Sequence, residues 1–599
     1  MSRRRALGLL VLVGLVAAVV WWLWFRGPDP SKMYVFKGVS GPTGVAKVGN
    51  PRLARIGDFD HGSTHRLAIL VTDPSSGWLG LVRAFHAHGV PITVTRDPAT
   101  ALSHQVVLVY PIISGRALTP EILRALAVHV RSGGTVLGFE LAGGGLGELF
   151  GVGDGVESRN RKLVTWTHPG GVPEEDAIPV SGTGGLGLGT VGYAPTSAQV
   201  MATYDDGSAA VTCRKVVGQA CLMGVDLGAF AARAMNGRAE GVARTYVNGY
   251  EPALDVLVDW VRDLYVANEV MPWIVSPVPG GKETAILLSH DVDFTRSVVN
   301  SKTYADELKR LNVSATFFVQ TKYVKDYNDD IFFNDRTLPI LKSLVSEGMD
   351  LESHSVAHAR TFAAFEMGSG RERYPRYMPF VQNKVLTRNA SVLGELRVSK
   401  FLLEALVGKK VHTFRPGYLA YPFGLPQALS ATGYGYSSSV TSNSTLTHLP
   451  YQLTFDRADG ALTDVFEFPV TIEDEAKPPL GERLDAAESV IGRIARRHGT
   501  AVILIHPDVT AGKLEFETRL VRDWRERAWI GSITAFGDWW RARDAAEVDL
   551  VQHDGHWFLE AGGGPEISDL VVLTPKARTG IVRLSRAAGD RAGGPIGSP

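Results

Sequence analysis

The chain contains 599 residues, which is too long for a single hydrophobic core, because domains usually span about 100–200 residues. Hydrophobic residues make up 45% and charged residues 21%, values that exclude a wholly disordered protein. Lys plus Arg and Asp plus Glu number 62 each, so no basic excess favours broad nucleic-acid binding. Two cysteines are too few for a disulfide-rich scaffold or a cysteine zinc module, so any chemistry depends on Asp, Glu, His, Ser or Arg.

The N-terminus has the pattern of a membrane anchor. Arginines at positions 3–5 precede residues 6–25, an uncharged stretch long enough to span about 30 Å of hydrocarbon as a helix. The arginines place the N-terminus in the cytoplasm, and the tryptophans at 21–24 belong at the far interface. No convincing cleavage site precedes Arg26, so we expect an uncleaved transmembrane helix at residues 1–30, with the rest of the chain outside the cytoplasm.

Strands and helices alternate after a short Pro- and Gly-rich stretch that we interpret as a stalk. Apolar strands are predicted at residues 66–72, 105–113 and 134–140, and amphipathic helices at 77–88 and 120–131. This alternation is typical of a parallel α/β sheet.

Residues 50–270 resemble the class I glutamine amidotransferase-like, flavodoxin-like fold, including a closing hairpin at 209–227. Those enzymes place a nucleophilic Cys after a strand that here runs into Glu140, with no Cys nearby. The resemblance therefore implies a non-catalytic domain, a spacer or a glycan-binding platform. Cys213 and Cys221 flank the predicted hairpin turn, where they either pair as a disulfide in an oxidising compartment or stay two buried thiols.

Four apolar runs in the second half of the chain end directly in polar residues. Parallel strands of a barrel bring such residues to one rim, where active sites are built. The residues concerned are Asp291 and Asp293, then His354 and His358, then Arg415, and finally His506.

A metal site is the chemistry that this set favours. His354 and His358 are four residues apart, so in a helical turn both imidazoles face the same ion. One carboxylate, from Asp291 or Asp293, completes a three-ligand set that leaves positions open for water, while the other accepts the proton of that water. Each motif alone has an ordinary structural explanation, and only their order at successive strand ends favours catalysis. A similar cluster at residues 58–65 follows no apolar strand, and we interpret it as a solvated loop.

Residues 275–545 resemble the polysaccharide deacetylase domain (NodB homology, carbohydrate esterase family 4), a distorted (β/α) barrel. Strand 315–319 and residues 467–469 are typical of that family. The resemblance implies a divalent metal, usually Zn²⁺, and a role for each residue of the site. Asp293, His354 and His358 hold the metal, Asp291 is the general base, Arg415 orients that base, the Tyr418 N–H helps to bind the oxyanion, and His506 is the general acid.

The chain departs from the family pattern at several positions. Val292 separates the two aspartates, which leaves open which of them is base and which is ligand. Gly417 and Leu419 replace the usual Pro and Gly of the third motif. Residues 436–438 (Tyr-Ser-Ser) lie where an Asp commonly partners the catalytic His, so what orients His506 stays open. An insertion at 362–386 either borders the substrate groove or forms a surface loop.

These observations predict an α/β protein with four parts. They are a transmembrane anchor (1–30), an amidotransferase-like domain (50–270), a deacetylase domain (275–545) and a small β appendage with a flexible tail (546–599). We expect a single-pass membrane protein whose catalytic domain is periplasmic or extracellular. The expected activity is metal-dependent removal of N-acetyl, or O-acetyl, groups from an extracytoplasmic polysaccharide, with no nucleic-acid partner. The alternatives are a catalytically impaired glycan-binding protein and an amidase or esterase acting on a non-polysaccharide substrate.

Overall fold

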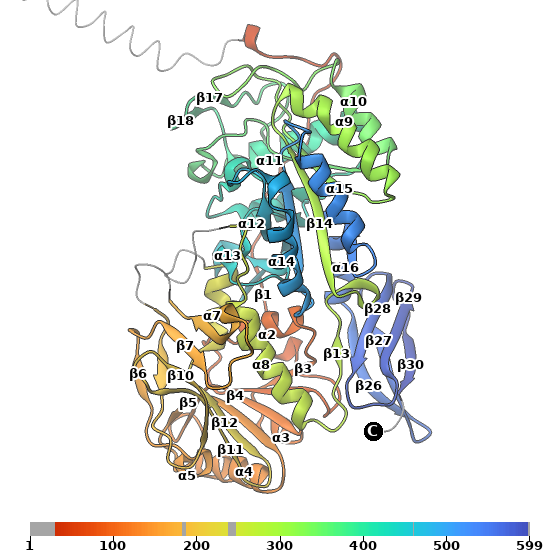
Figure 1. The fold of residues 1–599 in the computed structure, drawn as a ribbon. Coiled ribbons are helices and arrows are strands. Elements are labelled where there is room, and N and C mark those ends of the chain that lie inside the picture. The colour runs from red at the N-terminus through yellow and green to blue at the C-terminus, as the bar shows by residue number, and fades with distance from the viewer. Residues whose placement is uncertain (1–29, 182–186, 238–246, 459, 597–599) are drawn as a thin grey trace, which may run out of the picture.

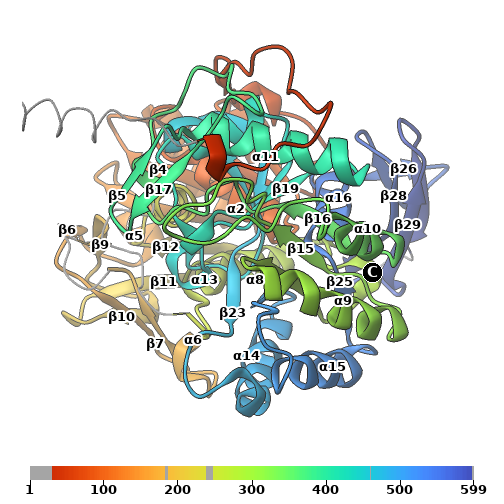
Figure 2. The ribbon, with the colours of Figure 1, turned by 90° about the horizontal axis from the view of Figure 1, so that it is seen from above.

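The structure is a computed structural model that describes residues 30–181, 187–237, 247–458 and 460–596. It is a mixed α/β protein with one nine-stranded and one eleven-stranded sheet, and with smaller sheets that include two of three strands each near the C-terminus. In Figure 1 the nine-stranded sheet lies at the bottom, the eleven-stranded sheet lies above it, and the C-terminal strands lie at the right. Figure 2 gives the view from above, onto the end of the molecule where helices α9, α10 and α11 lie.

The nine-stranded sheet has the parallel core that the sequence predicts. Its parallel strands run in the order β3-β2-β4-β5-β12. They are β2 (Leu67–Val71), β3 (Ile92–Thr95), β4 (Val106–Ser114), β5 (Thr135–Ala142) and β12 (Gln219–Met223). Leu67 and Ile69 pack on one face and Ala68 and Leu70 on the other, because successive side chains of a strand point to opposite faces.

Helices cover both faces of this sheet, which is why its strands are apolar throughout. The core on one face includes residues of α2 (Trp78–Ala87), α7 (Leu227–Met235) and α8 (Ala253–Asn268). The core on the other face includes residues of α4 (Pro120–Arg131). Asp97 and Thr119 cap their helices by accepting backbone N–H groups, and each is followed by Pro at the first helical position.

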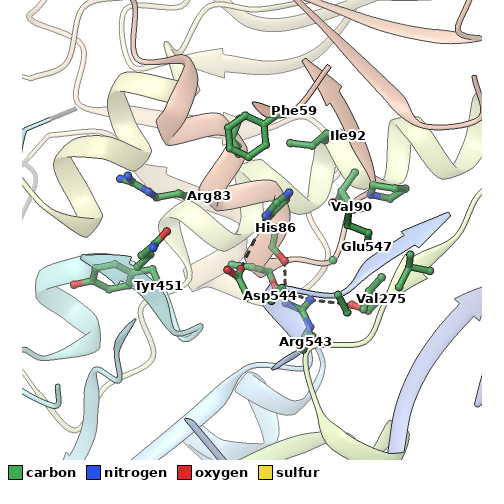
Figure 3. Close-up of a pocket in the computed structure, with 18 of the residues that line it drawn as sticks. Phe59, Arg83, His86, Val90, Ile92, Val275, Tyr451, Arg543, Asp544 and Glu547 are labelled. Atoms are coloured by element: carbon green, nitrogen blue, oxygen red, sulfur yellow. Dashed lines mark hydrogen bonds and ion pairs between the residues drawn. The ribbon is translucent and has the colours of Figure 1, made fainter. Parts of the chain in front are cut away.

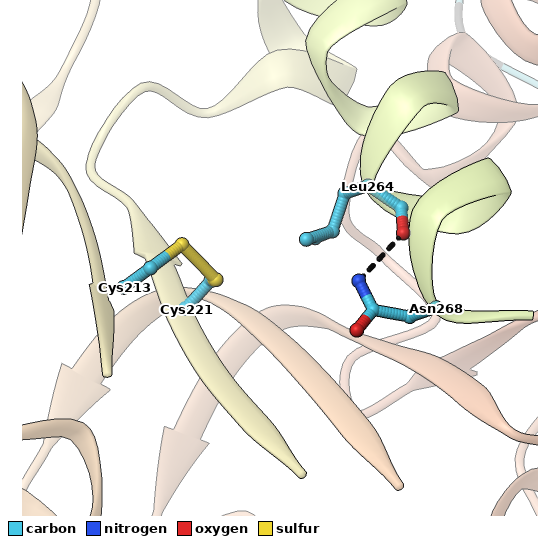
Figure 4. Close-up of a disulfide and its surroundings, with 4 residues drawn as sticks. All are labelled: Cys213, Cys221, Leu264 and Asn268. Carbon is cyan, nitrogen blue, oxygen red and sulfur yellow. Dashed lines mark hydrogen bonds between the residues drawn. A yellow bond between two sulfur atoms is a disulfide. The ribbon is translucent and has the colours of Figure 1, made fainter. Parts of the chain in front are cut away.

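The predicted hairpin is present and carries a disulfide. Strand β11 (Ala209–Lys215) pairs antiparallel with β12, with Cys213 directly opposite Cys221. The two sulfur atoms are bonded, so the structure has the disulfide rather than two free thiols (Figure 4). Strands β10 (Gln199–Tyr204), β7 (Leu163–Trp166) and β8 (Ala177–Pro179) continue the sheet beyond it.

The eleven-stranded sheet is also mainly parallel. Its strand order is β1-β22-β20-β19-β16-β15-β14-β24-β23, with β21 beside β22 and β25 beside β14. The strands are β1 (Arg52–Leu53), β14 (Thr284–Val292), β15 (Thr316–Val319), β16 (Asp350–Ser353), β19 (Thr413–Phe414), β20 (Tyr436–Ser437), β21 (Tyr451–Thr454), β22 (Ala461–Glu467), β23 (Val470–Glu473), β24 (Thr500–Ile505) and β25 (Ala528–Gly531). The helices that follow or cover them are α9 (Thr295–Arg310), α10 (Leu338–Ser346), α11 (Val392–Val407), α12 (Leu425–Ala431), α14 (Leu484–Ala495), α15 (Lys513–Trp524) and α16 (Ile533–Asp544).

The expectation of a membrane-spanning protein has to be corrected. Within the residues that the structure describes, no helix combines the length and apolarity needed to cross a bilayer. The segment on which the expectation rested, at residues 6–25, lies outside the described residues. We therefore withdraw the transmembrane helix, the membrane as a partner and the location that was inferred from them.

The stretch interpreted as a stalk is also different from the prediction. Met33 forms a β-bridge with Val324, and Gly41 forms one with Tyr374. Phe36 is buried in the main core, and β1 then pairs with β22 at the edge of the eleven-stranded sheet. Residues 30–53 therefore pack against the part of the molecule that contains the eleven-stranded sheet before the chain enters the nine-stranded sheet. Periodicity alone missed these contacts because the segment is too short and Gly-rich to show a pattern.

The C-terminal strands form a small β unit that is joined to the linker between the two large sheets. Strands β26 (Glu547–His553), β27 (His556–Gly562) and β30 (Ala592–Ile596) make one sheet. Strand β28 (Ile567–Thr574) pairs with β29 (Gly580–Arg586) and with β13 (Ile274–Val275) of the linker. This pairing ties the C-terminal end to the middle of the chain.

Arg543 holds the junction between these parts together. Its guanidinium is almost fully buried and donates to the carbonyl oxygens of Val275 and Ser276 in the linker, both at 2.9 Å. It also donates to the carbonyls of His86 and Ala87 at the end of α2, at 3.0 and 3.2 Å. Burial lowers the pKa of Arg543 to about 10, which still leaves it charged at neutral pH. Figure 3 shows this residue beside a cavity of about 420 Å³.

We predict that Arg543→Met destabilises the protein by about 3 kcal/mol, because four carbonyl groups, two buried and two part-buried, lose their donor while the apolar stem is kept. The measurement is the midpoint of thermal or urea unfolding. Arg591→Met is the control. Arg591 is 81% exposed, and its ion pair with Glu560 is long, at 3.8 Å, so losing it should cost little stability. An equal midpoint for the two variants would show that the junction does not depend on Arg543.

Candidate metal centre

The strand ends of the second sheet bring the predicted site residues together. Asp291 lies near the end of β14 and Asp293 just beyond it, while His354 directly follows β16. Arg415 follows β19, and His506 follows β24. Strands β14, β15, β16 and β19 are parallel neighbours in that order, and β24 flanks β14 on its other side. Their carboxyl ends therefore meet at one edge, as the sequence predicted.

Three side chains form a group that fits a divalent metal. Asp293 Oδ1 lies 3.2 Å from His354 Nε2 and 3.4 Å from His358 Nε2. Among the described residues, this is the one group of three or more His, Cys, Asp or Glu whose ligand atoms all lie within 4.8 Å of one another. Two imidazole nitrogens and one carboxylate oxygen are a typical three-residue set for catalytic zinc.

The hydrogen bonds around these ligands support the same assignment. Asp293 Oδ1 is buried and has no hydrogen-bond partner, which is costly for a carboxylate unless a cation occupies the site. His354 Nδ1 lies 2.7 Å from the carbonyl oxygen of Arg415, to which it donates. That bond fixes the tautomer and leaves the lone pair of Nε2 facing Asp293 and His358. The residues present therefore fit a metal ion.

The loop that carries the two histidines is not the helical turn that the sequence suggested. No helix is present at residues 354–358, and Ser355 and His358 have positive φ values of 67° and 49°. The two rings nevertheless lie with their centroids 4.8 Å apart. A tight loop just beyond β16 thus brings the two imidazoles together, as a helical turn would. It does so through backbone conformations that a non-glycine residue rarely adopts.

Asp291 is paired with a permanent cation. Arg415 is completely buried, and its Nη1 donates to Asp291 Oδ1 at 2.8 Å and to Ser289 Oγ at 2.9 Å. Its Nε and Nη2 donate to the carbonyl and the hydroxyl oxygen of Ser438. Ser289 and Asp291 share one face of β14 because they are two residues apart. The second oxygen of Asp291 lies 3.8 Å from His354 Nε2, on the side of the metal group.

His506 is oriented by Asp474, a residue that the sequence analysis missed. His506 Nδ1 lies 2.7 Å from Asp474 Oδ1, and the His506 N–H donates to Asp474 Oδ2 at 2.8 Å. Lys513 Nζ lies 2.6 Å from Asp474 Oδ2. Asp474 directly follows β23, so the strand-end pattern that marked the other site residues applies to it as well. His506 Nε2 points to Asp293, with Oδ2 at 3.6 Å.

The protonation states follow from these neighbours. Burial opposes the charged form of His506, but the hydrogen bond that His506 donates to Asp474 and the nearby charge of Asp291 raise its pKa to about 10. Burial lowers the pKa of His358 to about 4, against the pull of Asp293, which leaves the neutral imidazole that a metal requires.

Residues 281–437 match the polysaccharide deacetylase family. The match includes the three candidate metal ligands and Arg415, and it ends before Asp474 and His506. It covers well under half of the chain and does not extend to the first sheet, whose resemblance to glutamine amidotransferases stays a prediction.

Several solved structures of carbohydrate esterases and deacetylases resemble the chain weakly. A putative polysaccharide deacetylase from Mycobacterium smegmatis is 15% identical with a TM-score of 0.34, over 46% of this chain and 96% of that one. A family 4 carbohydrate esterase from Streptomyces lividans in complex with acetate is 16% identical with a TM-score of 0.26, over 42% and 94%. A CE4 family pseudoenzyme from Bacillus anthracis is 15% identical with a TM-score of 0.26, over 43% and 66%. We draw no functional conclusion from likenesses at these TM-scores. No curated protein sequence matches the chain.

The candidate metal centre, in the region that matches the polysaccharide deacetylase family, opens into a pocket of about 850 Å³. Phe294, Tyr327 and Tyr418 line it with 39%, 56% and 56% of their surface exposed. Tyr418 has a φ of 59°, and its ring centroid lies 4.9 Å from that of His358. An open, polar pocket with exposed aromatic faces suits a sugar chain, whose rings stack on such faces while its hydroxyls meet polar groups.

The insertion at residues 362–386 borders this pocket, which is one of the two alternatives expected for it. Val381, Asn383 and Lys384, at and just beyond strand β17 (Phe380–Asn383), line the pocket. The insertion's Tyr374 and Tyr377 are buried, where they bond to Phe36 of the N-terminal segment and to Glu395 of helix α11.

The second Asp and His cluster, at residues 58–65, does not form a ligand group. Asp58 pairs with Arg55, and His65 Nδ1 lies 2.7 Å from Glu269. Ser63 donates to Asp549 of the C-terminal β unit. The loop is therefore docked between parts of the molecule rather than solvated, and its polar side chains have structural partners.

We predict that Asp474→Asn lowers the pKa of His506, because the carboxylate that stabilises the protonated imidazole is lost. The measurement is the pH titration of the His506 ring by NMR in chelator-treated protein, with His506→Gln used to assign the signal. Asp508→Asn is the matched control, since Asp508 also binds Lys513 but makes no contact with the His506 ring. An unchanged titration in Asp474→Asn would contradict the assigned role of Asp474.

Proposed function

We propose that the deacetylase domain is a metal-dependent hydrolase that removes acetyl groups from a polysaccharide. The observation that carries the proposal is the buried group of Asp293, His354 and His358, which offers three ligands on one side of an open pocket. The Arg415–Asp291 pair and the Asp474–His506 pair flank it. This combination of an ionised carboxylate and a protonated imidazole is typical of acid–base hydrolysis.

A divalent metal, most simply Zn²⁺, when held by Asp293, His354 and His358, supplies Lewis acidity that polarises a carbonyl and makes a water molecule more acidic. Asp291 accepts the proton of the attacking water on a carboxylate oxygen, which Arg415 holds in place by donating to the other oxygen.

Tyr418, His506 and Asp474 act in the later steps of the proposed reaction. The backbone N–H of Tyr418 donates to the developing oxyanion. His506 holds a proton on Nε2 and delivers it to the departing amine, or to an alcohol if the acetyl group is an ester. The products are acetate and a free amino or hydroxyl group on the sugar. Asp474 is a positioning residue, since it acts through His506.

We also propose a substrate class and a role for the first domain. The exposed rings of Phe294, Tyr327 and Tyr418 favour a sugar polymer over a small amide. We propose the division into residues 50–270, 275–545 and 546–599, in which the first part is a spacer or a glycan-binding platform.

Two other functions remain as alternatives with their own tests. A glycan-binding protein that has lost catalysis is suggested by Gly417, Leu419 and residues 436–438, which depart from the family pattern. It predicts saccharide binding without acetate release. An amidase or esterase for a non-polysaccharide substrate predicts turnover only on small acetylated compounds.

We predict that the protein binds about one divalent ion per chain, and that His354→Ala loses this ion together with turnover. Asp291→Asn should keep the ion and lose turnover, because Asp291 is the base and not a ligand. Metal content by elemental analysis of zinc-reconstituted protein is the measurement, with His61→Ala as the control outside the site. If the single substitution Asp291→Asn removed the ion, Asp291 would be the metal ligand and Asp293 the base.

We predict acetate release from N-acetylated polysaccharides, lost on chelation and restored by Zn²⁺. A panel of N-acetylated, O-acetylated and small acetylated substrates, read by acetate production, separates the alternatives. Binding of polysaccharide with no acetate from any substrate, by protein shown to hold its metal, would favour the glycan-binding protein.

A further inference from the structure

Glu395, on the first turn of α11, contacts the loop that carries the two histidine ligands. Its Oε2 accepts hydrogen bonds from the backbone N–H groups of Val356 and Ala357, both at 2.8 Å. These two residues lie between His354 and His358 in the chain. Glu395 is only 1% exposed, as are Val356 and Ala357, so water cannot replace these bonds.

The loop needs such support because its backbone is strained. Ser355 and His358 both lie in the left-handed region, with φ values of 67° and 49°, and neither is glycine. Conformations of this kind persist only where surrounding contacts hold them. The Ser355 hydroxyl accepts the His358 N–H at 3.1 Å, and Asn328 donates to the His358 carbonyl oxygen at 2.8 Å. Glu395 supplies the acceptor for the two N–H groups in the middle.

The insertion anchors the other oxygen of the same carboxylate. The Tyr377 hydroxyl lies 2.8 Å from Glu395 Oε1, to which it donates, and accepts the Ser391 N–H at 3.1 Å. Tyr323 in turn donates to the Tyr377 carbonyl oxygen. Among the described residues, no Lys, Arg or His nitrogen lies within ion-pair distance of Glu395. The Glu395 carboxylate therefore bonds to the loop and to Tyr377, and no ion pair in the described part of the chain explains why it is buried.

We propose that Glu395 is a positioning residue of the metal centre. It sets the loop conformation in which His354 and His358 both face Asp293, by holding the two N–H groups between them, and Tyr377 fixes the direction of its carboxylate. The inference rests on the proposed metal site. It assigns to residues 362–386 a second task besides bordering the pocket, because Tyr377 belongs to that insertion.

The test measures zinc affinity of the full chain by competition with a chromophoric chelator. Glu395→Ala should weaken zinc binding by about 10–100-fold, the usual effect of losing a partner that orients metal ligands. Glu395→Gln should restore affinity to within a few-fold of the wild type, because its amide oxygen can accept the same two N–H groups. Tyr377→Phe should give a smaller loss than Glu395→Ala.

Asp255→Ala provides the matched control for stability. Asp255 is also a buried carboxylate that accepts a backbone N–H, from His448 at 2.9 Å, and a hydroxyl, from Thr447 at 2.6 Å, although it also lies 3.3 Å from His88 Nε2. It lies on α8, far along the chain from the metal ligands, and should lower the unfolding temperature without changing zinc affinity. A general loss of stability would instead weaken zinc binding in both alanine variants.

The outcomes separate the inference from the proposed function. If the wild type binds no zinc, the metal site itself fails. If the wild type binds zinc and folded Glu395→Ala binds it equally tightly, the positioning role is wrong and the proposed function stands. If Glu395→Ala does not fold, Glu395→Asp decides, because its carboxylate is one methylene too short for both N–H groups, and an unchanged affinity there overturns the inference.

Discussion

The buried carboxylate of Asp293 is the group on which the arrangement of the site depends. A carboxylate at this depth is stable as an anion only where cations or hydrogen-bond donors surround it. One oxygen faces His354 and His358, and the other faces His506. Because these partners follow β16 and β24, the balance of charge requires those strands and β14 to end at the same edge. Parallel pairing on both sides of β14 satisfies that requirement.

The neighbours of the two possible acid–base groups differ in a way that assigns their roles. Asp291 is held by Arg415, which donates to one of its carboxylate oxygens. His506 is held by Asp474, whose carboxylate stabilises the protonated ring. In the proposed reaction, a carboxylate base and an imidazolium acid thus face the same ligand group.

The parts of the molecule have separate tasks in this arrangement. The pocket wall comes from residues 291–513, so the described residues of the first sheet and the C-terminal β unit take no direct part in it. At the linker, β13 pairs with β28, and Arg543 donates to two linker carbonyls and to two at the end of α2. The first sheet's part of the molecule also contacts the second directly: Asp255 accepts the His448 N–H, and Arg497 pairs with Glu175.

The sequence by itself determined the α/β pattern and six side chains of the site, because an apolar run that ends in a polar residue is a local signal of a buried strand's end. The other contacts of the site depend on the order of the strands in the sheet and on how the helices pack against it. The pairing of Asp474 with His506, and the hold of Glu395 on the histidine loop, join segments whose proximity depends on how strands and helices pack. The strained conformation of Ser355, expected as helix, is stable for the same reason: contacts made only in the folded protein outweigh the preference of the local chain.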